Sequence, residues 1–318
     1  MASIATRSSE RPEDAAAIVG TGNATPAREP ADLMDAPVFR FREPLRVRWA
    51  EIDAQAIVFN AHYLMYIDTA IAGYWRALGV PYVEAMQQLG GDLYVRKASL
   101  EYHGSARYDD RIDIGVRCAR IGTSSLLFQA EVRRGRARLV TGELVYVYAD
   151  PASQTSRPVP ALLRDTFLAF EAGEPMFEVR TGSWQTLGAQ AARLRSEVFI
   201  TEQGIPADLE WDAADADAVH ALAVNRLGQP LATGRVLCSA DATARIGRMA
   251  VMRGLRGGGI GRAVLQALLE AARERSATQA LLHAQLDAIG FYERAGFSCR
   301  GEPFQEAGIA HQAMVRAL

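Results

Sequence analysis

Two segments of the sequence combine residue types that could do chemistry. The first is glycine-rich, runs from Met249 to Arg262, and lies between an expected strand and an expected helix. Glycines let backbone amides approach a ligand closely, and the first turn of a helix carries unpaired N–H donors and the positive end of the helix dipole. This combination is typical of a site for phosphate groups, with a plain flexible turn as the alternative.

The glycine-rich segment differs from two common phosphate loops. No Lys-Ser or Lys-Thr pair follows its glycines, so it is not a Walker A loop. The run Gly259-Ile260-Gly261 lacks the third glycine of a dinucleotide fingerprint, and no parallel βαβ unit frames it. Other features of the chain must therefore identify its ligand.

The second segment places a carboxylate between two expected elements. Asp53 follows a strand-like run that ends near Trp49 and precedes a helical repeat that includes Leu64. Such a carboxylate is usually a helix cap or a turn residue, and a nucleophile or general base is the alternative. Asp68 in the helical repeat is a rival carboxylate, for which an exposed helix position is the plainer interpretation.

The composition of the 318 residues excludes several function classes. The 35 basic and 37 acidic side chains give a formal net charge of −2, so no large positive field exists for nucleic acid or an anionic membrane. No apolar run has the length of a membrane span, and the first residues lack the apolar core of a signal peptide. The three cysteines are far apart and the histidines have no metal-ligand spacing. We therefore expect a soluble, cytoplasmic protein without a metal.

The pattern along the chain predicts a tail and two unrelated domains. Residues 1–37 are rich in proline, alanine and serine without an aromatic residue, so we expect them to be disordered. Residues 38–172 combine one long helix with consecutive strands, which is an α+β layer. Residues 173–318 mix strands and helices in a different order.

Periodicity and turn residues predict the individual elements. In the first domain we expect helices over 64–78, 83–89 and 161–170, and strands over 38–41, 46–49, 93–102, 111–120, 124–134 and 137–149. In the second we expect helices over 187–202, 260–272 and 287–295, and strands over 177–184, 219–226, 231–238, 244–252 and 280–284, around 304, and over 312–316.

The second domain resembles the GNAT N-acetyltransferase superfamily over residues 177–318. Arg256-x-x-Gly259-x-Gly261 is similar to the pyrophosphate loop of that superfamily. About 30 residues later, the run from Gly290 to Phe297, which includes Tyr292, is similar to its FYxxxGF helix. Likeness to a small prokaryotic branch lies in three further stretches, residues 199–206, 283–285 and 308–311.

This resemblance implies a mixed sheet that is splayed at its centre, with acetyl-CoA in the gap. Tyr292 would protonate the departing thiolate, main-chain groups of the strand would hold the acetyl carbonyl, and loop amides would bind the pyrophosphate. The residues implied to contact acetyl-CoA are Met249, Ala250, Val251, Arg256, Gly257, Gly258, Gly259, Ile260 and Gly261.

The acceptor side of this domain carries a weaker signal. Five carboxylates lie within ten residues, namely Asp208, Glu210, Asp212, Asp215 and Asp217. They could attract an ammonium substrate, or Glu210 could take its proton through water, but a solvated loop is the plainer interpretation. His220 and His283 lie in strand-like runs, which favours structural roles over base catalysis.

The first domain resembles the hotdog-fold acyl-CoA thioesterases of the 4-hydroxybenzoyl-CoA thioesterase type over residues 38–170. The likeness is carried by Arg48, Trp49, Glu51, Asp53, Val58, Asn60, Tyr63 and Leu64, and by the stretch from Leu100 to Asp110. Ala56 and Ile57 depart from the pattern, and Ala56 stands where the family usually has glycine.

This second resemblance implies that Asp53 attacks the thioester carbonyl or activates water to do so. Amides near Val58 to Asn60, at the start of the helix, would hold the oxyanion, and Asn60 or His62 would orient the thioester. Domains of this type pair their sheets with active sites at the interface. The resemblance therefore also implies a homodimer or a homotetramer.

Together the resemblances predict a hotdog domain, an antiparallel sheet wrapped on a long helix, followed by a GNAT mixed α/β domain. The predicted protein hydrolyses an acyl-CoA thioester in the first domain and transfers an acetyl or acyl group from CoA to an amine in the second. The alternative is an acyl-CoA-binding sensor or assembly module with one inactive domain.

Overall fold

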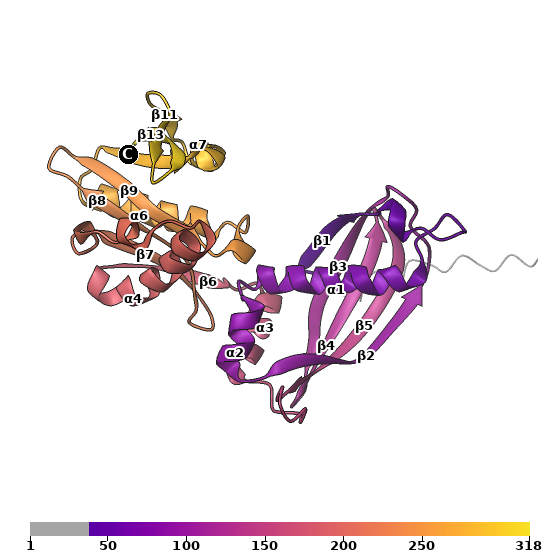
Figure 1. Ribbon diagram of the computed structural model, residues 1–318. Helices are drawn as coiled ribbons and strands as arrows, with labels where there is room; N and C mark the ends of the chain where they lie inside the picture. The colour runs from indigo at the N-terminus through magenta and orange to yellow at the C-terminus, as the bar shows by residue number, and fades with distance from the viewer. Residues whose placement is uncertain (1–37) are drawn as a thin grey trace, which may run out of the picture. The chain divides into compact units, whose positions relative to one another are not determined.

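The computed structural model describes residues 38–318, and the predicted disordered tail, residues 1–37, lies outside the described residues. The first part is a five-stranded antiparallel sheet that curves around a long helix, α1 (Figure 1). Its strands have the order β1-β3-β4-β5-β2. The bounds are β1 Phe41–Arg46, β2 Asp92–Tyr102, β3 Arg111–Ile121, β4 Ser125–Arg134, β5 Ala137–Ala149, α1 Asn60–Ala77, α2 Tyr82–Leu89 and α3 Ala161–Ala172.

An aromatic cluster fixes α1 and α3 against this sheet. The ring of Tyr74 on α1 is fully buried, meets Phe128 of β4 edge-on at 5.8 Å between centroids, and stacks on Phe167 of α3. Its hydroxyl donates a 2.6 Å hydrogen bond to Glu171 Oε1. A buried phenol needs such an acceptor. The hydrogen bond and the ring contacts together fix the position of α1 against the sheet.

A single strand, β1, takes the place of the two strands expected over 38–41 and 46–49. β1 runs through Pro44, which pairs in register with Asp113 of β3. Because β1 is an edge strand, a residue without an N–H group can be accommodated there without loss of a ladder hydrogen bond on its open side. The expected strand over 46–49 is wrong, since Trp49–Glu51 forms a 3₁₀ turn instead.

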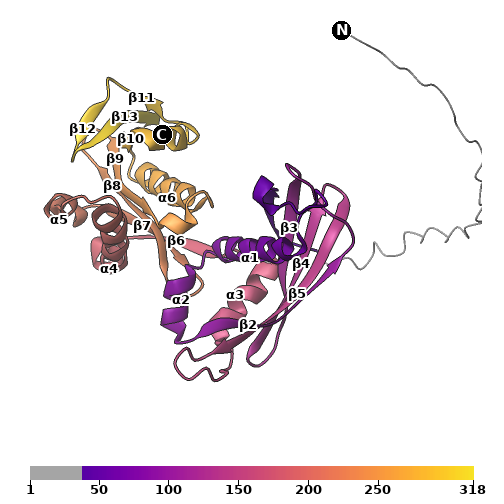
Figure 2. The ribbon, with the colours of Figure 1, turned by 45° about the vertical axis from the view of Figure 1, so that its right-hand side comes forward.

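The second part of the chain is a mixed sheet with the order β11-β13-β10-β9-β8-β7-β6, with β12 pairing β13. Figure 2 shows α4 and α6 on opposite faces of this sheet. The strand bounds are β6 Phe177–Gly182, β7 Val219–Asn225, β8 Pro230–Cys238, β9 Thr243–Val251, β10 Gln279–Gln285, β11 Ser298–Cys299, β12 Phe304–Glu306 and β13 Ile309–Ala317. The helix bounds are α4 Trp184–Arg195, α5 Ala207–Glu210, α6 Ile260–Glu274 and α7 Ile289–Glu293.

The sheet opens between its two parallel strands. β9 and β10 pair only over three residues, from Gln279 opposite Thr243 to Leu281 opposite Arg245. Beyond this point β9 stays paired with β8, and β10 stays paired with β13. The predicted splay at the centre of the sheet is therefore confirmed.

The helix expected over 187–202 begins earlier and changes its pitch. It starts at Trp184, and after Arg195 it continues as a seven-residue π-helix, Ser196–Glu202. π-Helical turns are rare and occur frequently at functional sites. The helix expected over 287–295 is shorter, because α7 ends at Glu293.

For the acidic run over residues 208–217, the solvated-loop interpretation is wrong at its central residues. Glu210 and Asp215 are buried with Arg195, whose Nε donates to Glu210 Oε1 at 2.5 Å and whose Nη1 donates to Asp215 Oδ1 at 2.8 Å. Arg235 of β8 bonds Asp215 and Asp212 at 2.6–2.7 Å. Burial alone would raise the pKa of Asp215, but the two guanidinium groups hold its pKa below the usual value.

This ionic network is closed by Arg248 of β9. Its Nη2 donates to Asp212 Oδ2 at 3.0 Å, and its Nε lies 3.3 Å from Glu210 Oε2. We define the ionic network as Arg195, Arg235, Arg248, Glu210, Asp212 and Asp215. Its three positive and three negative charges compensate each other, which buried ions require.

Replacement of Arg195 by methionine should destabilise the second domain strongly. The change leaves buried carboxylates without their partner, and we expect the free energy of unfolding to fall by about 3–5 kcal/mol. Urea unfolding followed by tryptophan fluorescence measures it, since the guanidinium lies over the rings of Trp184 and Trp211. The control is Arg193→Met on the exposed side of α4, which should change stability by about 0.5 kcal/mol or less. Equal effects of the two changes would contradict the role of the network.

Candidate functional site

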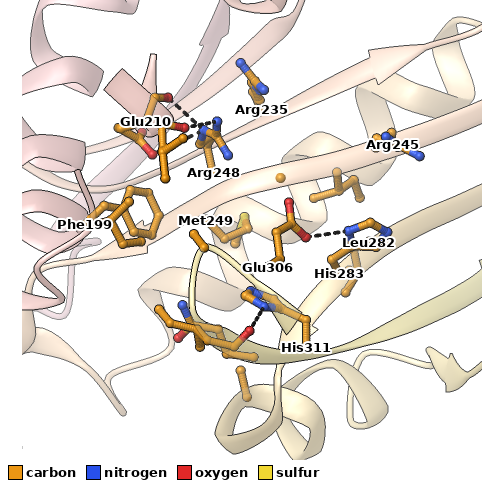
Figure 3. A pocket seen from close by; sticks show the side chains of 18 of the residues that line it. Phe199, Glu210, Arg235, Arg245, Arg248, Met249, Leu282, His283, Glu306 and His311 are labelled. Atoms are coloured by element: carbon orange, nitrogen blue, oxygen red, sulfur yellow. Dashed lines mark hydrogen bonds and ion pairs between the residues drawn. The ribbon is translucent and has the colours of Figure 1, made fainter. Parts of the chain in front are cut away.

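A pocket of about 510 Å³ opens where β9 and β10 part (Figure 3). Its walls include Met249 on β9, His283 on β10 and Tyr292 on α7. Glu210 and Arg248 of the ionic network line another part of the wall. The pocket therefore brings together Met249, Glu210 and Tyr292, three residues that the sequence predicted as parts of one site.

Three separate stretches of sequence that resemble one prokaryotic branch also meet here. Gln285 Nε2 donates a 3.1 Å hydrogen bond to Gln203 Oε1 and so joins the second stretch to the first. The lining residues from the three stretches are Phe199, Gln203, Ile205, His283, Gln285, Ile309 and His311. Segments more than 100 residues apart thus form one cavity.

Tyr292 is a buried residue of the pocket wall. Its ring is 8% exposed, meets Phe291 and Phe297 edge-on, and lies on the pocket wall. Burial raises the pKa of Tyr292 to about 12. The phenol therefore keeps its proton over the whole physiological range.

Strand β9 is strained beside the pocket. Arg248 has φ of 53°, and the register against β8 shifts between Thr233 and Arg235, which marks a β-bulge. A positive φ in a residue with a side chain persists only where surrounding contacts enforce it. Here the ionic network holds the Arg248 guanidinium, and the bulge directs the next residue, Met249, to the pocket wall.

The glycine-rich loop leaves only part of its amide donors available, because the Gly258 amide already donates to Leu255 O at 3.4 Å. Gly257 and Gly259 have φ of 84° and 85°, a conformation that residues with side chains rarely adopt. Gly259 caps α6 without a side-chain hydrogen bond, so the first amides of α6 lie outside the helix ladder. A Cβ atom at Gly261 would lie 3.0 Å from Val251 Cγ2, which explains a glycine at this point of close packing.

Arg256 is held by protein groups. Its two terminal nitrogens each lie 2.7 Å from an oxygen of Glu202, and its Nε donates to Val251 O at 3.1 Å. The guanidinium lowers the pKa of Glu202. Arg256 thus ties the glycine-rich loop to the π-helix, and the loop residues Arg256 to Gly261 are not among those that line the pocket.

The two histidines of the second domain have different environments. His220 is buried, its Nε2 lies 2.9 Å from Asp215 O, and burial lowers its pKa, so a structural role fits it. His283 lies on the pocket wall with its Nδ1 2.8 Å from Glu306 Oε2 (Figure 3). Sequence reasoning missed Glu306, and the only signal was its position just before the 308–311 stretch.

In the first domain, Asp53 organises a tight loop. Its Oδ1 accepts hydrogen bonds from the amides of Gln55 at 2.8 Å and Ile57 at 3.4 Å. In the described part of the chain no hydrogen bond reaches its Oδ2. The residue is half-buried, so it is both a turn residue and a carboxylate with one oxygen available.

Ala56 occupies the left-handed conformation that its position requires. Its φ is 58°, and its amide donates to Asp53 O at 3.0 Å. This explains why the related family usually has glycine there. In this chain the Cβ atom of Ala56 makes the turn strained.

Two of the three amides expected to hold an oxyanion already donate hydrogen bonds to backbone carbonyls. The N–H of Val58 donates to Ala106 O and that of Phe59 to Glu51 O, both at 2.9 Å. Asn60 is the first residue of α1, so its amide has no acceptor within the helix. The available donors therefore begin at Asn60.

Buried Glu51 anchors this loop. Tyr66 OH and the Arg48 amide donate to its Oε2 at 2.6 and 2.7 Å. Burial alone would raise the pKa of Glu51, but these hydrogen bonds and the Arg48 guanidinium keep its pKa below the usual value. Glu51 is thus a charged support beneath the Asp53 loop.

The other two predicted residues of this domain lie on α1. The Nδ1 atom of His62 is buried without a hydrogen bond, and the ring meets Phe59 edge-on. Asp68 is exposed. The charge of Asp68 acts on Tyr146, whose pKa is raised to about 12 mainly by burial.

Among the described residues, 38–318, no helix is long and apolar enough to cross a membrane. In the same range no group of three or more His, Cys, Asp or Glu side chains has a geometry suited to a metal ion.

Comparison with known proteins identifies both parts. Residues 55–141 match the thioesterase superfamily, and residues 186–318 match the acetyltransferase (GNAT) domain. The uncharacterized N-acetyltransferase YjcF of Bacillus subtilis is 32% identical over 124 residues, covering 39% of this chain and 87% of that protein. The acyl-CoA thioester hydrolase YbgC of Escherichia coli is 27% identical over 121 residues, covering 38% and 90%.

A solved structure is also similar to the second part. Escherichia coli ElaA is 28% identical with a TM-score of 0.41, and the match covers 44% of this chain and 99% of ElaA. Through its second domain the chain belongs to the GNAT acetyltransferase family, and its first domain is a thioesterase-superfamily (hotdog) domain.

Proposed function

We propose that the chain is a bifunctional enzyme of CoA thioesters. The first domain hydrolyses an acyl-CoA, and the second transfers an acetyl or acyl group from CoA to an amine. The observation that carries the proposal is the pocket at the open end of β9 and β10, with the protonated Tyr292 in its wall. The names of the relatives, an N-acetyltransferase and a thioester hydrolase, support the two reactions.

In the second domain the open strands supply main-chain groups to the acyl donor. The segment Met249 to Val251 would hold the acetyl carbonyl, and the amides from Gly257 to Gly261 would bind the pyrophosphate at the start of α6. Tyr292 would give its proton to the CoA thiolate as the C–S bond breaks. Arg256 would act indirectly, because Glu202 already binds its guanidinium.

Glu210 remains a candidate for the acceptor side. Burial raises the pKa of Glu210 despite the neighbouring guanidinium groups, which would favour proton uptake. However, Arg195 and Arg248 hold its two carboxylate oxygens. We assign Glu210 to shaping and charging the acceptor side of the pocket.

In the first domain Asp53 would act on the thioester carbonyl with its available Oδ2, as nucleophile or through water. Asn60 at the first position of α1 would stabilise the oxyanion with its amide, helped by the helix dipole. The unpartnered Nδ1 of His62 suits a contact with the thioester. Asp68 is the rival carboxylate of this site.

The hotdog domain also suits pairing of two chains. β2 is an edge strand of 11 residues, and the side chains from Val95 to Ser99 along it are exposed. A long edge with unpaired main-chain groups is a surface on which another strand adds. We propose a homodimer that continues the sheet across β2, with a homotetramer as a higher assembly.

Asp53→Asn should lower thioester hydrolysis by about 100-fold or more, because the amide is neither nucleophile nor base. The measurement is the release of free CoA thiol from a panel of acyl-CoAs. Asp68→Asn is the discriminating variant on the same domain, and a loss with this variant alone would assign the chemistry to Asp68. Unchanged hydrolysis with both would contradict a carboxylate mechanism here.

Tyr292→Phe should slow acetyl transfer by about 100-fold while acetyl-CoA still binds, since only the proton donor is removed. Calorimetry with CoA and a thiol-release assay with amine acceptors separate binding from transfer. Because the pKa of Tyr292 is about 12, the wild-type rate should show no loss from ionisation of this phenol up to about pH 10. Binding without any turnover in the wild type would favour the sensor function instead.

The wild-type protein should be a dimer. Size-exclusion chromatography with light scattering should give twice the chain mass of 34.6 kDa. Val95→Asp places like charges near each other across a twofold β2 pair and should shift the protein toward the monomer. Val83→Asp on α2 is the control, because Val83 is similarly exposed but lies away from the edge strand. A monomeric wild type would rule out the dimer.

A further inference from the structure

A histidine and a glutamate form a pair in the wall of the pocket, and the proposed reaction does not use them. His283 Nδ1 lies 2.8 Å from Glu306 Oε2, and both residues line the cavity that contains Tyr292 (Figure 3). The His283 side chain is 34% exposed, so the ring is accessible from the cavity. This arrangement differs from that of Glu210, whose oxygens face two guanidinium groups.

The position of Glu306 is fixed by a tight hairpin. β12 and β13 are joined by Ala307 and Gly308, with φ of 50° and 77°, and Glu306 pairs in register with Ile309. Two positive φ values in a two-residue connection are typical of a type I′ turn, which matches the twist of the strands. The ring of Phe304 on β12 meets the His283 ring edge-on at 4.8 Å. Turn and ring packing therefore orient the pair.

We infer that His283 is the general base that takes the proton from the acceptor ammonium, with Glu306 as its positioning residue. This inference rests on the proposed acetyltransferase function. A carboxylate that accepts from Nδ1–H leaves the lone pair on Nε2, which is the tautomer that a base needs. Histidine is the side chain best suited to proton exchange near neutral pH.

The proton balance of the reaction closes with these groups. His283 Nε2 takes a proton from the ammonium, and the free amine attacks the thioester carbonyl carbon. The C–N bond forms, the C–S bond breaks, and Tyr292 protonates the thiolate. The new amide nitrogen returns one proton to the Tyr292 phenolate, and the imidazolium of His283 releases its proton to water.

Two acceptors test the base directly. Benzylamine is protonated at neutral pH and needs a base, whereas hydroxylamine is already neutral and does not. With acetyl-CoA as donor, His283→Gln should lose benzylamine acetylation by about 100-fold and keep most of the hydroxylamine reaction. Added imidazole should partly restore benzylamine turnover in His283→Ala. Equal losses with both acceptors, or no loss, would overturn the inference.

His311→Gln is the matched control. Its ring also lines the pocket and stacks on Phe304, and its Nδ1 lies 2.8 Å from Ile309 O, which leaves the lone pair on Nε2 as well. In the described residues no carboxylate pairs with it, so it lacks the partner that Glu306 provides to His283. It should not separate the two acceptors. If the wild type acetylates neither amine, the proposed acetyltransferase function fails for these acceptors, and this outcome is distinct from a failure of His283.

A second measurement needs no turnover. Nitrogen-15 NMR of the neutral imidazole should find the hydrogen of His283 on Nδ1, and Glu306→Gln should give a mixture of tautomers. A hydrogen on Nε2 in the wild type would overturn the inference whatever the acceptor. Unchanged tautomers in Glu306→Gln would remove Glu306 as the positioning residue.

Discussion

The early parting of β9 and β10 is the constraint on which the second domain depends. β9 and β10 pair over only three residues, so the remaining main-chain groups on their facing edges do not bond to one another. Such groups require other partners, because buried amides and carbonyls are costly when unpaired. On their other edges the two strands stay paired, β9 with β8 and β10 with β13. An extended ligand with its own amides and carbonyls is the natural partner for the gap.

Charge compensation maintains this opening from one side. The bulge at Arg248 requires a positive φ, and the guanidinium of that residue is bound by Glu210, the last residue of α5, and by Asp212. Arg195 and Arg235 bind the same carboxylates from α4 and β8. The ionic network thus connects the strained residue of β9 to α4 and to the pocket wall. Glu210 and Asp215, in an acidic run that the sequence analysis interpreted as a solvated loop, are buried partners in this network.

The two folds and the long elements could be predicted from the sequence, because local periodicity or short motifs specify them. The helical repeat around Leu265 and the glycine turn before it needed no knowledge of distant residues. The failures came from tertiary context. Pro44 looks like a strand breaker until the strand is known to lie at an edge, and the π-helix depends on contacts that periodicity does not record.

The candidate sites show the same division. Tyr292, Met249 and Asp53 could be proposed because motifs fix their neighbours. In the structure Tyr292 and Met249 line the pocket, and Asp53 stands in the loop before α1. Glu306 could not be found, because its pairing with His283 joins residues 23 apart through a hairpin. A histidine in a strand is ordinarily a packed ring, and only the cavity beside it changes that interpretation. His220, with a similar local sequence pattern, is buried and fits the ordinary case.

The two domains solve a related chemical problem with different control of water. Both proposed reactions develop negative charge on the thioester oxygen, which main-chain amides would stabilise at a helix start in one domain and beside a bulged strand in the other. The hydrolase site must admit water, and Asp53 stands in a half-buried, accessible loop. The proposed transferase site must favour an amine over water, and its wall includes Met249 and the buried Tyr292, which is 8% exposed. The different exposure of the two sites, more than any difference in the donor, would decide whether an acyl group passes to water or to nitrogen.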